Sequence, residues 1–197
     1  MKILSFEGIE GVGKSTQINL LKKYLEKKHF NVEVLREPGS TPAGERIRDI
    51  LLNSDNNLSN ESELLLMFAA RSELINNKIN NLSCDYLLLD RFYDASIAYQ
   101  GYGRNLSLSF INELISFTKC PVPHKSILLD IPVNIGFSRK TNDTKDRIES
   151  SGDKFFNKVR NGYLKIAKSN PDRFIIINAD DDIDNIHTEI LINLDLK

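Results

Sequence analysis

The chain has 197 residues, of which 27% are charged, and its formal net charge is −1. This balance argues against a generally basic nucleic-acid-binding surface and against a disordered acidic tail. The length suits one substantial core, so we expect a single domain spanning residues 1–197. Only a few apolar residues separate Lys2 from Glu7, too short a run for a signal peptide or a membrane span. Together with the absence of a CxxC motif, this predicts a cytoplasmic protein that binds neither nucleic acid nor membrane.

Short apolar runs alternate with stretches of helical period along the chain. The first run is 3–7 (ILSFE), followed by an expected helix from Ser15 to about Lys28 and a second run at 31–35 (NVEVL), which together form a βαβ unit. Three more runs, each after a segment long enough for a helical crossover, lie at 86–90, 126–131 and 173–179. Runs that are apolar on both faces are typical of buried parallel strands. We therefore predict an α/β fold, a three-layer α/β/α sandwich around a parallel sheet of about five strands with right-handed crossovers.

Chemically distinctive residues follow the carboxyl ends of four predicted strands, where open α/β sheets bind their ligands. The segment GIEGVGKS follows the first strand, REPGSTP the second and DRF the third. After the fourth strand and one short helix comes a charged stretch from Arg139 to Arg147. We expect these segments to converge on one arginine-rich site.

The segment after the first strand is a phosphate-binding loop. Gly8, Gly13, Lys14 and Ser15 satisfy G-x-x-x-x-G-K-[ST] between a strand and a helix, the context that the motif requires. Glycines let successive N–H groups point inward, and the helix adds its positive end. Lys14 would bridge the β- and γ-phosphates and Ser15 would ligate Mg²⁺. The residues predicted to bind ATP are Gly8, Ile9, Glu10, Gly11, Val12, Gly13, Lys14, Ser15 and Thr16.

Such a loop leaves the reaction open among a GTPase switch, an ATPase motor and a kinase. The D-x-x-G and N-K-x-D motifs of a switch do not occur in the sequence. A motor usually places a glutamate after the aspartate that ends the third strand, but here Arg91 follows Asp90. Asp90 would hold the metal through water or orient Lys14, while Arg91 suits a second anion. A nucleoside monophosphate is the simplest such acceptor, because its phosphate is already a nucleophile and needs no general base.

Five segments then carry a resemblance to a known family: FEGIEGVGKST, LREPGSTPAGERIR, LLLMFAARSEL, DRFYDASIAYQGYGR and DRIES. In this order they closely resemble the thymidylate kinase family, in its lid-arginine branch. The resemblance implies a P-loop nucleoside monophosphate kinase that uses ATP and Mg²⁺ to convert dTMP to dTDP for dTTP synthesis, as a homodimer. The alternatives are a kinase for dUMP or UMP and a nucleotide-binding module without transfer activity.

The resemblance also implies residues that bind the acceptor's phosphate and sugar. Glu10 would face the deoxyribose and its 3′-hydroxyl, unless it is a solvated loop acid. Arg48 and Arg91 match the acceptor-phosphate arginines, although surface ion pairing is the alternative for Arg48. Glu37 would position Mg²⁺ or Arg91, or cap its turn.

For the base, the resemblance implies that Arg71 binds thymine on its O4 side. The stacking ring is expected at Phe68, with Met67 lining the pocket; a core role for both is the alternative. Three positions near the base edge and the sugar complete the substrate site: Ser96, Tyr99 and Gln100. The serine should leave room for the 5-methyl group.

A lid at about 139–150 is the last implied feature. One branch of the family carries a phosphate-binding arginine at the P-loop position that Gly11 occupies here, so this chain should take that arginine from the lid. Arg139 and Arg147 are the expected catalytic pair, and which of them reaches the transferring phosphate is left open. The cations of the lid are Arg139, Lys140, Lys145 and Arg147.

Overall fold

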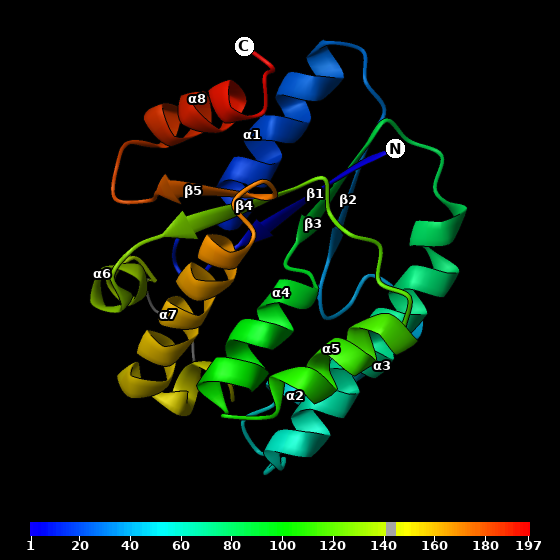
Figure 1. The fold of residues 1–197 in the computed structure, drawn as a ribbon, viewed down its shortest axis with the longest axis vertical. Coiled ribbons are helices and arrows are strands. Elements are labelled where there is room, and N and C mark those ends of the chain that lie inside the picture. The colour runs from blue at the N-terminus through cyan, green and yellow to red at the C-terminus, as the bar shows by residue number, and fades with distance from the viewer. Residues whose placement is uncertain (141–144) are drawn as a thin grey trace.

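The computed structural model of the protein describes residues 1–140 and 145–197, so the middle of the predicted lid, 141–144, lies outside the described residues. One sheet of five parallel strands runs through the molecule in the order β2-β3-β1-β4-β5 (Figure 1). The predicted parallel α/β sheet is therefore confirmed. The strands are β1 (Lys2–Glu7), β2 (Val32–Arg36), β3 (Tyr86–Asp90), β4 (Lys125–Asp130) and β5 (Phe174–Asn178).

Helices cover both faces of the sheet. In Figure 1, α1 (Lys14–Lys27) and α8 (Ile183–Asn193) lie above the sheet, and the other long helices lie below it. The longer helices below are α2 (Pro42–Leu52), α3 (Asn60–Asn77), α5 (Leu108–Phe117) and α7 (Asp153–Ser169). The short elements are η1 (Ile79–Asn81), α4 (Tyr93–Ser96), η2 (Ile97–Gly103), α6 (Val133–Ser138) and η3 (Glu149–Ser151).

The two faces of the central strand β3 explain this layering. Leu88 points to the side of α1, where it shares a buried cluster with Leu21. Its neighbours Leu87 and Leu89 point to the opposite side and pack in a second cluster with Leu74 of α3. All five of these leucines are inaccessible to solvent, and burying each side chain contributes about 1.5–3 kcal/mol. A strand buried on both faces needs helices on both faces.

The element η2 was not expected from the sequence. It is a seven-residue π-helix that continues α4, and it packs closely against α7. A Cβ on Gly162 would lie 2.7 Å from the Tyr102 ring, and one on Gly103 would lie 2.6 Å from Phe155. These two glycines allow the close approach, which places the polar side chains of η2 beside the carboxyl ends of the strands.

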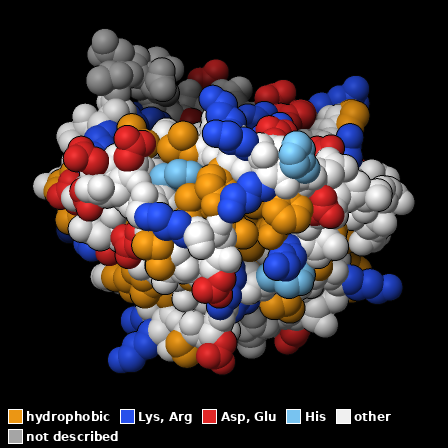
Figure 2. All heavy atoms as spheres, turned by 90° about the horizontal axis from the view of Figure 1, so that it is seen from above, with side chains coloured by type: hydrophobic (Ala, Val, Ile, Leu, Met, Phe, Trp, Pro, Cys, Tyr) orange, Lys and Arg blue, Asp and Glu red, His pale blue; other side chains and the backbone are white. Residues whose placement is uncertain are grey.

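Figure 2 looks from above, onto the side where Figure 1 places α8 and the C-terminus. Basic, acidic and apolar side chains are interspersed across this face. Within residues 1–140 and 145–197, no helix combines the length and the apolar character needed to cross a membrane.

Candidate active site

The phosphate-binding loop joins β1 to α1, as predicted. Gly8 and Gly13 have φ angles of 133° and 88°, in the region that favours glycine. The Lys14 Nζ donates to the carbonyl oxygens of Ile9 at 2.8 Å and Gly8 at 3.3 Å. Burial lowers the pKa of Lys14 to about 8, and the positive charge of Arg91 acts in the same direction. The lysine is thus held across the loop, close to where phosphates would replace its carbonyl partners.

The neighbouring Gly11 is required by packing. Its φ angle is 73°, and a Cβ at this position would lie 1.8 Å from the carbonyl oxygen of Gly136 in α6. An arginine at this position would therefore force α6 away from the loop. Packing of α6 against the loop therefore explains why no arginine stands at this P-loop position, and the sequence alone did not reveal this packing.

Ser15 and Asp90 meet where α1 begins and β3 ends. The Ser15 Oγ donates to the Asp90 Oδ2 at 3.3 Å, and both residues line the same cavity. A hydroxyl and a carboxylate suit Mg²⁺, which usually takes only one or two protein ligands and completes its shell with phosphates and water. In the described part of the chain, no three His, Cys, Asp or Glu side chains gather as a ready-made metal site. The two residues fit a metal that arrives with its nucleotide.

A cavity of about 390 Å³ opens beyond the carboxyl ends of β1, β2 and β3. It is lined by side chains from the P-loop, the strand ends, α2, α3 and η2. The two ends of the predicted lid also contribute, with Lys140 on one side and Asp146, Ile148 and Glu149 on the other. Many residues predicted from the sequence are brought together here: Glu10, Gly11, Lys14, Ser15, Glu37, Arg48, Met67, Arg71, Asp90, Arg91, Ser96, Tyr99 and Gln100.

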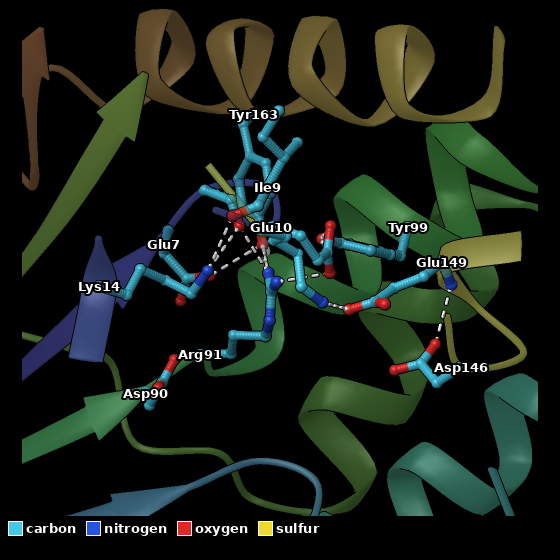
Figure 3. Close-up of polar contacts among 12 residues, drawn as sticks. Glu7, Ile9, Glu10, Lys14, Asp90, Arg91, Tyr99, Asp146, Glu149 and Tyr163 are labelled. Atoms are coloured by element: carbon cyan, nitrogen blue, oxygen red, sulfur yellow. Dashed lines mark hydrogen bonds and ion pairs between the residues drawn. The ribbon is translucent and has the colours of Figure 1, made fainter. Parts of the chain in front are cut away.

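Arg91 links the phosphate loop to the rest of this cavity (Figure 3). Its guanidinium donates to the Gly8 carbonyl oxygen at 2.6 Å and to the Glu10 Oε1 at 2.8 Å. The Tyr99 hydroxyl donates to the same Glu10 carboxylate at 2.8 Å, and the Arg91 guanidinium lies 4.9 Å from the Tyr99 ring centroid. Glu10 is therefore held by two partners, which excludes the alternative of a solvated loop acid.

The turn that presents Arg91 depends on Glu7, a residue that the sequence analysis did not single out. Glu7 is fully buried and accepts hydrogen bonds from the Phe92 N–H at 2.9 Å and the Tyr163 hydroxyl at 3.0 Å. Burial, reinforced by the charge of Asp94, raises the pKa of Glu7 to about 8. Arg91 itself has a φ of 68°, an uncommon conformation for a non-glycine residue, and these contacts help to hold it. As the last residue of an apolar strand, Glu7 gave no separate sequence signal.

Glu37 holds Arg71, a partner that the sequence analysis did not name for it. The Arg71 Nε and Nη2 approach the Glu37 Oε2 at 2.8 Å and 2.7 Å, and both side chains are almost fully buried. Within the described residues, the Arg71 Nη1 and the Glu37 Oε1 are buried without a hydrogen-bond partner. Because both residues line the cavity, these two atoms are suited to contact a polar ligand.

The structure places Met67, and not Phe68, at the cavity. Phe68 is 3% exposed and packs in a small buried cluster with Leu64 and Ile111. Its ring centroid lies 4.5 Å from the Arg71 guanidinium carbon. The expectation that Phe68 stacks on the base is therefore corrected, because its ring supports Arg71 instead. Residues three and four positions before an arginine share one side of a helix, so the spacing alone could not separate them.

Arg48 also reaches the cavity, from α2. It donates to the Pro38 carbonyl oxygen at 3.0 Å, which fixes its guanidinium beside the REPG turn. Arg48 and Arg91 thus supply two cations to one cavity, one from α2 and one from the turn after β3.

The two predicted lid arginines do not line the cavity in this structure. Arg139 donates to the Ala179 carbonyl oxygen at 2.7 Å and to Asp180 at 2.9 Å. Arg147 lies at the other end of the lid, where it donates to the Leu51 carbonyl oxygen at 2.8 Å and to Glu63 at 2.7 Å. Of the lid cations, Lys140 lines the cavity. The expected placement of Arg139 and Arg147 at the phosphate loop is therefore not seen in this conformation.

A P-loop between the first strand and the first helix of a parallel sheet, beside a cavity lined by arginines, defines the class of the molecule as a P-loop nucleotide-binding fold. The family model described as thymidylate kinase matches residues 6–190. A thymidylate kinase of Vesicomyosocius okutanii is 47% identical over 183 residues, covering 90% of this chain and 89% of the relative. One from Kosmotoga olearia is 41% identical over 192 residues, covering 95% and 92%.

A solved structure gives the same result. The crystal structure of thymidylate kinase from Ehrlichia chaffeensis superposes with a TM-score of 0.80 at 33% identity, and 98% of each chain is covered. The chain belongs to the thymidylate kinase family, as the motifs predicted.

Proposed function

We propose that this protein transfers the γ-phosphate of ATP to dTMP, giving ADP and dTDP for dTTP synthesis in the cytoplasm. The observation that carries the proposal is that the P-loop residues and the arginines line the same cavity. These residues are Lys14, Ser15, Arg48, Arg71 and Arg91. A donor site and an acceptor site must adjoin for direct transfer, and the names of the relatives give the acceptor as thymidylate.

In this proposal the P-loop binds the donor phosphates. Ser15 and Asp90 would hold Mg²⁺, which would supply positive charge to the phosphates. Lys14 stabilises the negative charge of the transferring group. Arg48 and Arg91 orient the acceptor phosphate, whose oxygen attacks without a general base.

The rest of the cavity binds the nucleoside. Glu10, already fixed by Tyr99, accepts a hydrogen bond from the 3′-hydroxyl of the deoxyribose. The unpaired Nη1 of Arg71 donates to the O4 of thymine, because it is the buried donor in the cavity that lacks a partner among the described residues. Ser96 leaves space for the 5-methyl group.

The function is tested by a coupled ADP-release assay with dTMP, dUMP, UMP and dCMP as acceptors. We expect ADP release that depends on the acceptor and is fastest with dTMP. Release without any acceptor would contradict a kinase, and a preference for UMP would contradict the thymine assignment. No release with any monophosphate would favour a nucleotide-binding module.

The lid is the second testable part of the proposal. The Arg139–Asp180 ion pair is exposed, at 37% and 49% of the two side chains, so breaking it costs at most about 1 kcal/mol. The Arg147–Glu63 pair is buried, at 12% and 1%, and is harder to break. We therefore propose that Arg139 moves to the transferring phosphate and that Arg147 anchors the lid. Arg139→Ala should lower kcat by about 10²-fold, whereas Arg147→Ala should mainly lower the melting temperature.

Steady-state kinetics and thermal melts on both variants make this comparison, and Lys145→Ala, at an exposed lid cation, serves as the matched lid control. If neither arginine variant changes kcat, the lid assignment is wrong. If Arg147→Ala alone lowers kcat, the roles of the two arginines are exchanged.

A homodimer is also part of the proposal. Large apolar side chains are exposed on three helices that lie together at the lower right of Figure 1. They are Ile50 of α2, Leu65 of α3, and Phe110 and Phe117 of α5. Exposed apolar patches on soluble domains commonly mark interfaces. Sedimentation equilibrium should give twice the chain mass, and a monomer at micromolar concentration would contradict this.

A further inference from the structure

Glu63, in the first turn of α3, joins three parts of the molecule. Its side chain is 1% exposed and accepts hydrogen bonds from Gln100 at 3.0 Å, from Arg104 at 3.0 Å and from Arg147 at 2.7 Å. Gln100 lies in η2, and Arg104 is the first residue after η2. Arg147 lies near the C-terminal end of the predicted lid at about 139–150. An acid in the first turn of a helix usually needs no explanation beyond the helix dipole, so this role gave no sequence signal.

The charge of Glu63 determines what it can do to Gln100. Burial by itself would raise the pKa of Glu63, but hydrogen bonds from Arg104, Gln100 and Arg147 outweigh it and hold the pKa below its usual value. An ionised carboxylate only accepts hydrogen bonds, so the Gln100 side chain must present its NH₂ group to Glu63. The Gln100 Oε1 is thereby turned away from Glu63, and Gln100 lines the cavity.

This orientation completes a pattern of one donor and one acceptor. The Arg71 Nη1 is an unpaired buried donor, and the Gln100 Oε1 accepts no hydrogen bond from the described residues. Thymine offers the complementary pair, the O4 acceptor and the N3–H donor. Cytosine offers the reverse, an N4 amine and an N3 acceptor, so both contacts would be lost. If the Gln100 amide were free to turn over, its NH₂ group would match N3 of cytosine.

We propose that Glu63 is a positioning residue for base selection: it fixes the Gln100 amide with its oxygen toward the cavity, so that the site favours thymine over cytosine. Glu63 itself does not touch the substrate. The inference rests on the proposed function, because it assigns Gln100 to the base edge of dTMP.

The test is a Glu63→Gln variant. A glutamine at 63 can donate as well as accept, so it no longer dictates which way the Gln100 amide points. We expect the KM for dTMP to rise about tenfold with kcat and the KM for ATP little changed, as for the loss of one buried hydrogen bond. The inhibition constant of dCMP against dTMP should stay constant or fall, so that the selectivity for dTMP drops by at least the same factor.

Two further variants separate positioning from stability. Glu63→Asp keeps the charge for the arginines but withdraws the carboxylate from Gln100, so it should lose selectivity with a smaller drop in melting temperature; it serves as the test if Glu63→Gln does not fold. Arg104→Lys weakens the contacts of Glu63 without touching Gln100, and it should lower the melting temperature while keeping selectivity.

A double-mutant cycle completes the experiment. In a Gln100→Leu background, Glu63→Gln should change selectivity no further, because the amide that it orients is gone. Equal losses for dTMP and dCMP in the single variant, or an effect that persists in the Gln100→Leu background, would overturn the inference. Failure of the proposed function would look different, because the wild-type protein would then show no dTMP-dependent ADP release.

Discussion

A Lys14→Ala variant is expected to fold and to lose kcat by about 10²–10³-fold, with a smaller effect on the KM for dTMP. The side chain lies across the phosphate loop and donates to the Ile9 carbonyl oxygen at 2.8 Å and to the Gly8 carbonyl oxygen at 3.3 Å. Its charge is needed most when negative charge develops on the transferring group, so the loss falls on kcat. Steady-state kinetics with both substrates varied measure the effect, and a variant that keeps full kcat would contradict the assigned role.

The pH dependence of ATP binding provides a second measurement on Lys14. Because its pKa is lowered to about 8 in the nucleotide-free protein, the lysine loses its charge as the pH rises through that value. ATP affinity should therefore be highest below pH 8 and fall above it. The pKa of Glu7 lies in the same range, so the profile must be compared with that of Lys14→Ala, in which the contribution of the lysine is removed.

A Glu37→Ala variant is expected to be destabilised by about 3–5 kcal/mol, because it leaves the Arg71 guanidinium buried without its counter-charge. Both side chains are at most 4% exposed, so water cannot easily replace the lost carboxylate. The same change should weaken dTMP binding, because Arg71 loses the contact that aims it. Urea unfolding measures the first effect and isothermal titration the second.

The chain offers a matched control for this prediction. Glu45 also pairs with an arginine, Arg36, at the same 2.7 Å, but these side chains are 42% and 50% exposed. Glu45→Ala should cost at most about 1 kcal/mol and leave dTMP binding unchanged. If both variants lose the same free energy of unfolding, burial of the Glu37–Arg71 pair does not determine its contribution to stability.

The strands and the phosphate loop could be predicted because their signals are local. Apolar runs of five to seven residues indicated each strand to within about one residue, and the loop motif spans eight residues with a required spacing. The resemblance added Arg48, Arg71, Ser96 and Gln100, all of which line the cavity. The sequence could not decide which of Met67 and Phe68 faces the cavity, because both lie on nearly the same side of α3. Packing of Phe68 against α5 decides it.

The sequence by itself determined that the protein has a parallel α/β sheet, a P-loop and an arginine-rich site beyond the strand ends, because each depends on neighbouring residues. Only the tertiary structure decided what holds those residues in place. Glu7 supports the Arg91 turn across 85 positions, and Glu63 meets Arg147 across 84. Gly11 is required because α6 lies against the loop. Contacts of this kind arise from packing between distant segments, and the sequence of one segment does not specify its partner.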